Sequence, residues 1–347
     1  MKVLYALLAV IILALVPIVG VGELGLRYLF GVIIPYAAFA IFVVGLAYRI
    51  VRWARTPVPF NIPTTAGQQK SLPWIKASNV ESPNSTLGVI ARMALEILFF
   101  RSLLRQVKGE LRGGELVYEG RPYLWVGGLL FHWAMLFIVV RHLLVFLRTP
   151  PDWVTSAYIV DAFLRRVIPT ALQISTVIVL VAVAYLFLRR VVSPQLRYIS
   201  LPSDYFAVLL FVAIFVTGAL MQQVFVVPFT PVRSLLAGLI TLSPRVPEIH
   251  PFFFVHFFLF NVLLAYFPFS KLMHAPGVFF SPTRNMRNDS RARRYINPWN
   301  YPVKVATYED YENRFRKELK VAGLPLESEG GEAMKTPVKI SLRGEGG

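Results

Sequence analysis

The sequence predicts an all-α protein, a polytopic transmembrane helix bundle of about six spans with a cytoplasmic amphipathic helix and a cytoplasmic C-terminal tail. The composition supports this fold class, because 56% of the residues are hydrophobic and only 16% are charged, against about 25% charged in soluble domains. A bilayer span needs about 20 mostly apolar residues. The stretches that meet this requirement are residues 3–19, 28–50, 124–147, 168–188, 205–226 and 251–272.

The first two stretches form a predicted N-terminal transmembrane hairpin, residues 1–52. Lys2 followed by an apolar run resembles a secretory signal, but a clear small-x-small cleavage motif is missing and a second span follows at once. We therefore expect the first span to be retained as a helix, and its removal by cleavage is the alternative.

The connecting loop, residues 53–122, contains a segment that alternates apolar residues with arginines at helical spacing, GVIARMALEILFFRSLLR at residues 88–105. This pattern is typical of a helix that lies on the membrane face or on a partner. Residues 123–275 make a predicted four-helix core. The tail, residues 276–347, mixes arginines with Trp299 and Tyr301. Since such aromatic residues are common interface anchors, we expect the tail to bind a partner, with anionic lipid as the alternative.

Basic residues are distributed unevenly between the two sides of the predicted bundle. The predicted inner side comprises Lys2, the loop of residues 52–121, the loop after the fourth span and the chain from Lys271 onward. It carries 28 lysines and arginines, whereas the other side carries six. Cytoplasmic loops retain an excess of these residues. We therefore predict a multi-pass protein of the cell membrane with both termini in the cytoplasm. The same asymmetry explains the net charge of +17 without nucleic acid.

The chain contains no cysteine. This excludes disulfides, Cys-ligated zinc, thiolate-held iron–sulfur clusters and covalent c-type haem within the chain. Iron–sulfur chemistry would have to reside on another subunit, and any haem would be held non-covalently.

Four of the five histidines lie within or at the end of two antiparallel spans: His132 and His142 in the third, His256 and His274 in the sixth. Polar groups in the bilayer are costly and mark function, and imidazole is a haem iron ligand. Depth pairs His142 with His256 near the outside and His132 with His274 near the inside, so that each pair can hold one b haem. The alternative for a single histidine is a hydrogen bond between helices. His250 lies at the outer entrance to the sixth span.

The two histidines of the third span are ten positions apart, whereas those of the sixth span are eighteen apart. In a regular helix these separations correspond to rises of about 15 Å and about 27 Å. We expect helix tilt and a kink at Pro268 to absorb the difference. Arg141, beside His142, would be expensive without a partner. A haem propionate and snorkelling towards the interface are the two explanations.

This histidine spacing resembles that of the respiratory nitrate reductase gamma-subunit family of quinol-linked dihaem cytochromes b. The tail HAPGVFFSPTRNMRNDSRARRYINPWNYPVK is similar to that of the membrane cytochrome b subunits of the sulfite-reduction-associated DsrMKJOP complexes, and related subunits serve heterodisulfide reductases. The resemblance implies two b haems held by His132, His142, His256 and His274. It also implies electron exchange with menaquinone near the outer haem, in sulfate or sulfite respiration.

The partners implied by the resemblance are a cytoplasmic iron–sulfur subunit like that of heterodisulfide reductase (DsrK-like) and further membrane and periplasmic subunits, including a multihaem cytochrome c. The chain would then be the quinone-reactive electron-transfer subunit of an oxidoreductase complex embedded in the lipid bilayer. The lack of cysteine fits this division, because the clusters would lie on the partner.

A quinone site needs a group that exchanges protons near the outer haem. The candidates on that side are Asp161, Arg165, Arg166 and His250. Asp161 can instead cap the fourth span or pair with Arg165, and His250 can be an ordinary interfacial residue. Two other functions stay open at this point: a haem-free transporter or proton-relay channel, and a purely structural membrane anchor.

Overall fold

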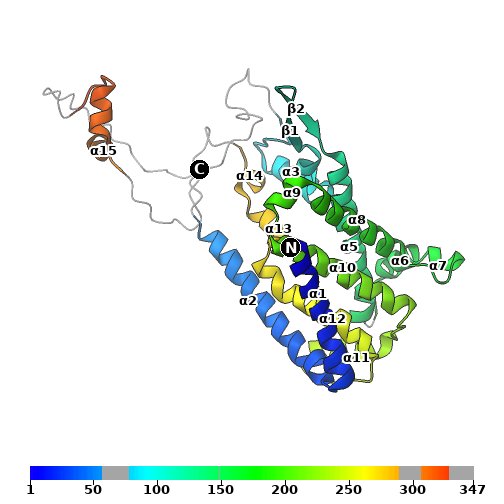
Figure 1. Cartoon of the computed structure of the whole chain (residues 1–347). Coiled ribbons are helices and arrows are strands. Elements are labelled where there is room, and N and C mark those ends of the chain that lie inside the picture. Colours follow the sequence, from blue (N-terminus) through cyan, green and yellow to red (C-terminus); the bar gives the residue numbers. More distant parts are fainter. Residues whose placement is uncertain (57–77, 148, 289–305, 328–347) are drawn as a thin grey trace. The chain divides into compact units, whose positions relative to one another are not determined.

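The computed structural model describes residues 1–56, 78–147, 149–288 and 306–327, and the chain divides into two units, Met1–Trp299 and Asn300–Gly347. The first unit is a helical bundle (Figure 1). Six of its helices are long and apolar enough to cross a membrane, which confirms the predicted fold class and number of spans. Their bounds are Lys2–Glu23, Leu29–Ala54, Pro122–Phe146, Ile174–Val192, Pro202–Gln223 and Pro251–Phe269.

Four of these spans are α-helices throughout most of their length, and the first two contain π-helical turns. The elements are α1 (Lys2–Pro17) with η1 (Ile18–Glu23), η2 (Leu29–Ile33) with α2 (Ile34–Ala54), α5 (Pro122–Phe146), α8 (Ile174–Val192), α10 (Pro202–Gln223), and α12 (Pro251–Tyr266) with η3 (Phe267–Phe269). Proline occupies the first helical position of α5, α10 and α12. There its missing N–H costs nothing and its fixed φ suits the helix.

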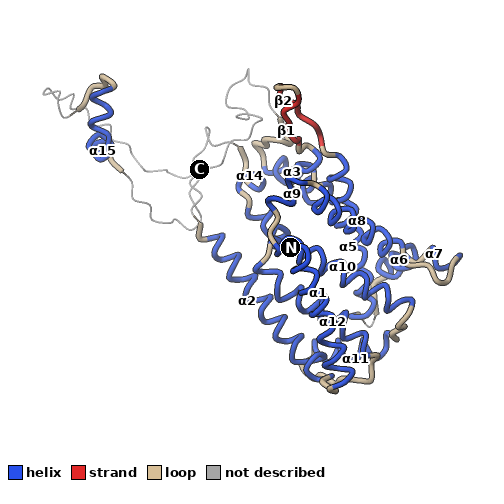
Figure 2. Tube along the Cα trace, in the orientation of Figure 1, coloured by secondary structure: helices blue, strands red, loops and turns tan. Residues whose placement is uncertain are grey.

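Shorter helices connect and flank the spans. They are α3 (Thr86–Phe99), α4 (Arg101–Leu104), α6 (Asp152–Asp161), α7 (Leu164–Val167), α9 (Pro194–Ile199), α11 (Phe229–Ile240), η4 (Lys271–Met273), α13 (His274–Gly277), η5 (Val278–Phe280) and α14 (Pro282–Asn285). Figure 2 shows how fully helices make up the described part of the chain, with one short hairpin.

The spans pack side by side in a chain of neighbours: α5 along α8, α8 along α10, α10 along α12, and α12 along α2. Helix α1 lies against both α10 and α12. Gly127 permits the close approach of α5 and α8, because a Cβ atom there would lie 2.6 Å from the ring of Tyr185. The outer faces expose large apolar side chains, such as Ile12 at 59% and Val44 at 68%. Apolar patches of this kind suit contact with lipid rather than water.

The fourth span begins later than expected, at Ile174 instead of residue 168. Ile168 is extended (φ −124°, ψ 97°), and the next residue is Pro169, which disfavours helical conformation in the residue before it. The sixth span shows the predicted interruption. Helix α12 ends at Tyr266, Pro268 lies in a 3₁₀ turn, and Ser270 is extended (φ −115°, ψ 177°). Regular helical rise therefore stops before His274, as expected.

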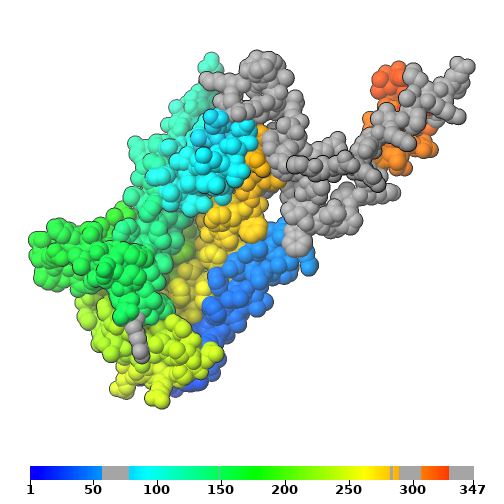
Figure 3. Space-filling view, turned by 180° about the vertical axis from the view of Figure 1, so that it is seen from behind, coloured from blue at the N-terminus to red at the C-terminus, as the bar shows by residue number. Residues whose placement is uncertain are grey.

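The amphipathic segment of residues 88–105 is two helices rather than one. Phe100 adopts a left-handed conformation (φ 49°) and separates α3 from α4. Helix α3 lies beside α14, and these segments are seen together in cyan and orange in Figure 3. Its buried face includes Arg92 and Glu96, while Leu87 and Ile90 are exposed.

A β-hairpin follows α4 and was not expected from the sequence. Strands β1 (Val107–Arg112) and β2 (Glu115–Gly120) pair in antiparallel register. Gly113 and Gly114 form the turn with φ of 62° and 89°. Positive φ at both central residues is the signature of a tight hairpin turn, and Gly-Gly is one of its favoured sequences.

The described part of the second unit contains α15 (Tyr308–Val321). Thr307 and Asp310 cap its start, each side chain accepting a backbone N–H of the other. The hydrogen bonds that the backbone N–H and the hydroxyl of Thr307 donate to the Asp310 carboxylate lower its pKa. The predicted interface aromatics Trp299 and Tyr301, like most of the predicted partner-binding tail, lie outside the described residues.

Candidate functional site

Two pairs of histidine rings meet between the third and sixth spans. The rings of His142 on α5 and His256 on α12 have centroids 6.4 Å apart and planes 12° apart. The rings of His132 on α5 and His274, the first residue of α13, have centroids 6.0 Å apart and planes at 86°. The structure thus brings together the same pairs that depth along the two spans suggested.

The separation of the rings fits the donor geometry of a bis-histidine metal site. A bond from a metal to imidazole nitrogen is about 2 Å. With the ring centre about 1 Å behind the nitrogen, two ligands on opposite sides of one metal have ring centres about 6 Å apart. Both pairs have this spacing. Among the described residues, no group of three His, Asp or Glu side chains is arranged to hold a free metal ion.

The ring nitrogens of the four histidines are oriented in the same way. Nδ1 of His132 lies 2.7 Å from the carbonyl oxygen of Gly128, and Nδ1 of His142 lies 2.7 Å from that of Ile138. Nδ1 of His274 lies 2.8 Å from the carbonyl oxygen of Lys271. A carbonyl oxygen only accepts, so Nδ1 carries the proton in each ring. The other nitrogen, Nε2, keeps its lone pair for a metal.

His256 also carries its proton on Nδ1, but the acceptor is a side chain instead of a backbone carbonyl. Its Nδ1 lies 3.0 Å from Oγ1 of Thr217 on α10, and that hydroxyl donates its proton to the carbonyl oxygen of Ala213 at 2.7 Å. A hydroxyl has only one proton, so Thr217 accepts from the His256 Nδ1–H. The adjacent Gly218 leaves room for the ring, because a Cβ atom there would lie 3.2 Å from Cε1 of His256.

His250 differs from the other four. It is exposed, and its Nδ1 accepts the backbone N–H of Phe252 at 3.2 Å. Its Nδ1 therefore carries no proton, the reverse of the state found in the pairs. Its ring lies 5.5 Å from that of Phe225, in keeping with the ordinary interfacial position considered above.

The inner pair is bordered by aromatic rings from two directions. The rings of Phe100 and Phe131 lie 4.8 Å and 5.1 Å from that of His132. Phe100 is the left-handed residue between α3 and α4, and strained positions of this kind cluster at functional sites. The following turn is held by Glu96, which accepts from the Ser102 backbone N–H at 3.1 Å and pairs with Arg284 at 2.6 Å.

A second ion-pair group secures the far side of this turn. Glu81 accepts from Arg101 at 2.6 Å and also pairs with Arg105. Partial burial by itself would raise the pKa of Glu81, but the hydrogen bond and charge of Arg101, with Arg105 and Arg92 nearby, lower it below its ordinary value. The amphipathic segment is thus fixed beside the inner pair by charges.

Arg141 next to the outer pair has a protein partner that the sequence analysis missed. Its Nη1 lies 3.1 Å from Oδ2 of Asp161 and also donates to Gln173. Asp161 in turn accepts from the backbone N–H and the hydroxyl of Ser175, at 2.6 Å and 2.7 Å. The alternative that Asp161 caps the fourth span is confirmed, whereas its pairing with Arg165 is wrong.

Snorkelling of Arg141 towards the interface is therefore not observed, whereas its contact with a haem propionate stays a prediction. Its side chain is only 12% exposed and is already paired within the protein. The signal was present in the sequence, because an arginine inside a span needs an acid and Asp161 is the nearest carboxylate on that side after Asp152.

The four residues predicted for the quinone site come from different elements. Asp161 lines a cavity of about 260 Å³ between α5, α6 and α8. Arg165 is half-buried and Arg166 exposed on α7, and His250 lies before α12. Apart from Asp161 and Ser175 the cavity lining is apolar: Leu130, Trp133, Ala134, Phe137, Val160, Ile174 and Ile178.

Comparisons with known proteins agree with this geometry. The family profile described as nitrate reductase gamma subunit matches residues 89–294, a range that contains all four paired histidines. The chain is 45% identical over 279 residues to the Hdr-like menaquinol oxidoreductase cytochrome b-like subunit of Archaeoglobus fulgidus, covering 78% of this chain and 83% of the relative. The protein of the same description from Archaeoglobus profundus is 38% identical over 273 residues, covering 77% and 81%.

Proposed function

The chain belongs to the nitrate reductase gamma subunit family, and from this premise we propose that it is the dihaem cytochrome b subunit of a membrane complex that exchanges electrons with menaquinone. The observation that carries the proposal is the pair of ring contacts, His142 with His256 and His132 with His274, at 6.4 Å and 6.0 Å. The relatives named as cytochrome b-like subunits support it.

The chain's own residues prepare both proposed sites for ligation. Each Nδ1–H is engaged, which fixes the tautomer and the orientation of the ring and raises the basicity of Nε2. Bound b haem supplies one-electron redox chemistry. The separation of ten positions from His132 to His142 sets the two sites about 15 Å apart along α5. Two sites at two depths suit electron transfer across the bilayer.

We propose that the menaquinol headgroup binds in the cavity beside Asp161. Of the four candidate residues, only Asp161 lines this apolar cavity between α5, α6 and α8. Its carboxylate is linked through Arg141 to the helix that carries His142. The acid can accept a hydrogen bond from the quinol, and the apolar walls suit the quinone tail. Arg165, Arg166 and His250 lie elsewhere and become secondary candidates.

The partner we propose is a cytoplasmic iron–sulfur subunit of the heterodisulfide reductase type. The relatives are named Hdr-like, and a chain without cysteine requires clusters to lie on another subunit. The proposed setting is sulfate or sulfite respiration, in a complex with other membrane and periplasmic subunits including a multihaem cytochrome c. We further propose that both termini lie in the cytoplasm, which the excess of basic residues on their side supports.

The experiment is reduction of the purified protein by a soluble menaquinol analogue, followed in the α-band of b haem. We expect rapid reduction in the unaltered protein. In Asp161→Asn the amide keeps the cap to α8 but leaves the charge of Arg141 without its acid. We therefore expect a raised KM for the quinol together with a lower unfolding midpoint, and the KM is measured on protein that retains its haem. Arg166→Gln, an exposed substitution on the same side, serves as the control. A spectrum without b haem would contradict the proposal and favour a haem-free transporter or anchor. A normal KM in Asp161→Asn would remove only the quinol site from the proposal.

A further inference from the structure

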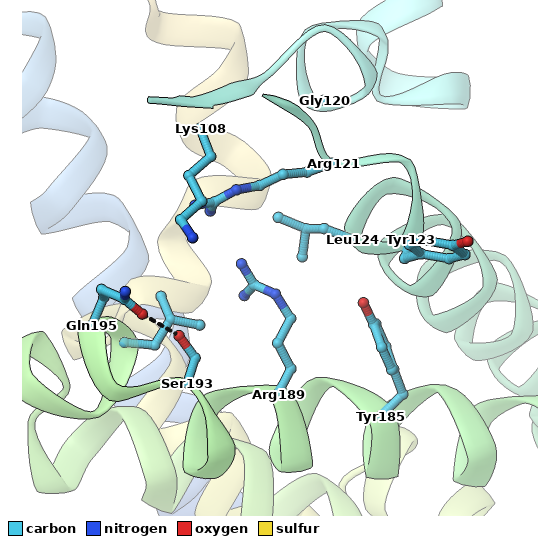
Figure 4. A pocket seen from close by; sticks show the side chains of 10 residues that line it. Lys108, Gly120, Arg121, Tyr123, Leu124, Tyr185, Arg189, Ser193 and Gln195 are labelled. Atoms are coloured by element: carbon cyan, nitrogen blue, oxygen red, sulfur yellow. Dashed lines mark hydrogen bonds between the residues drawn. The ribbon is translucent and has the colours of Figure 1, made fainter. Parts of the chain in front are cut away.

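A second cavity lies at the opposite end of α5 from Arg141. It has a volume of about 270 Å³ and is enclosed by the start of α5, the end of α8, the start of α9 and the base of the β-hairpin. Figure 4 shows the side chains of Lys108, Arg121 and Arg189 converging in it from three different elements. This cavity plays no part in the histidine sites.

The positive charge in the cavity is not balanced by the protein. No carboxylate lines it. Lys108 pairs with Glu110 beside it, but within the described residues neither Arg121 nor Arg189 forms an ion pair or a side-chain hydrogen bond. Two half-buried guanidinium groups therefore share one cavity. Like charges in such surroundings repel one another unless an anion lies between them.

The neighbouring Arg190 differs from Arg189, because its guanidinium group has partners within the protein. It donates to the hydroxyl of Ser200 at 2.9 Å and lies 3.8 Å from Asp204. Its positive charge is thus balanced by an acid of the same protein. Arg189, one residue earlier and on another face of α8, points into the cavity instead (Figure 4).

The remaining lining suits a lipid headgroup at the edge of a membrane. Tyr185 directs its hydroxyl towards the cavity, and Tyr123 lies at its rim with 79% exposure. Leu124 and Leu196 add apolar surface. The cavity lies where two membrane-length helices end, the level at which tyrosines are enriched and phosphates are found. Basic pockets between spans are known to bind anionic headgroups.

We propose that this cavity binds the phosphate group of an anionic phospholipid, with Arg121 and Arg189 as the principal ligands and Lys108 and the Tyr185 hydroxyl as additional donors. Arginine is suited to this role because its planar donors match phosphate oxygens in pairs. The inference does not depend on the proposed redox function. It assigns a stabilising lipid to the junction of the hairpin with the bundle.

The test measures binding of phosphatidylglycerol to the full chain in detergent micelles by native mass spectrometry. The cavity variant is Arg121→Gln/Arg189→Gln. The control is Arg55→Gln/Arg197→Gln, which removes the same charge at two exposed positions outside the cavity. We expect the cavity variant to lose about tenfold in affinity, and the control to match the unaltered protein. Arg121→Lys/Arg189→Lys keeps the charge and should recover part of the binding. An unchanged unfolding midpoint and elution volume in detergent verify folding of each variant.

Equal loss in the cavity and control variants would overturn the proposal, since binding would then follow net charge alone. A second arm replaces the lipid by inorganic phosphate, and a third by phosphatidylcholine. Arginine-dependent binding of phosphate without binding of phosphatidylglycerol would overturn the lipid as the source. If the cavity variant instead weakened only the association with the iron–sulfur partner, with lipid binding intact, the cavity would belong to a protein interface and the proposal would fail.

Discussion

The proton on Nδ1 distinguishes the candidate ligands from the remaining histidine. His132, His142 and His274 donate it to backbone carbonyls and His256 donates it to Thr217. His250 accepts at the same atom. Because the proton is held on Nδ1 in these four rings, Nε2 is the nitrogen that keeps a free lone pair. A metal ligand requires such a fixed tautomer and ring orientation.

Thr217 gives a direct test of this preparation. The substitution Thr217→Val keeps the shape of the side chain but removes the hydroxyl that accepts the His256 Nδ1–H. Such outer partners contribute about 10–100-fold to metal affinity. We expect a shifted midpoint potential or partial loss of the outer haem, with the inner haem unchanged, in a redox titration followed optically. Thr241→Val, at the end of α11, is the control. Identical titrations of both variants and the unaltered protein would count against the assigned tautomer.

Arg141 and Asp161 supply a second prediction at this scale. Removing one member of a buried ion pair costs about 3–5 kcal/mol, because it strands the other charge. We expect Arg141→Met to lower the unfolding midpoint in detergent strongly. Arg141→Met/Asp161→Asn should recover part of the loss, since the amide keeps the hydrogen bonds to Ser175. An effect of Arg141→Met no larger than that of the exposed Arg166→Met would show that the pair is not buried in the membrane protein.

The helical elements were the most predictable level of the structure. Each span is recognisable by its length and apolar composition. The predicted ends of the spans therefore lie within a few residues of the observed ends. The fourth span was the exception, because residues 168–173 are apolar enough to pass as helix while Pro169 prevents it. The β-hairpin was not predicted although Gly113 and Gly114 lie between its two strands, because neither strand shows a clear alternation of apolar and polar residues.

The candidate site was predictable in its ligands but not in its partners. Histidine depth follows from helix rise alone, and the pairs follow from depth. The acceptor Thr217 and the acid Asp161 lie on other helices, 39 and 20 residues away from the groups they bond. Sequence spacing holds no rule for such contacts, which arise only when the helices pack.

The first unit, Met1–Trp299, is a bundle whose basic residues are predicted to gather at one end. Figure 1 shows α3, the hairpin and α14 gathered near that end, whereas α11 lies at the other. This polarity gives a topology prediction. A green fluorescent protein fused after Gly347 should fluoresce in cells, and alkaline phosphatase inserted after Ser243 should be active, because each reporter works on only one side of the membrane. The reverse pattern would invert the assigned inner and outer haems without altering their ligands.

The central claim is that four histidines hold two haems in two fixed pairs. The measurement that tests it most directly is the haem-to-protein ratio, by pyridine haemochrome assay, in single and double histidine-to-alanine variants. We expect two haems per chain in the unaltered protein, and one in His142→Ala, in His256→Ala and in the double variant of that pair. We expect none in His142→Ala/His274→Ala and two in His250→Ala. One haem remaining in the crossed double variant, or none in the paired one, would contradict the assignment.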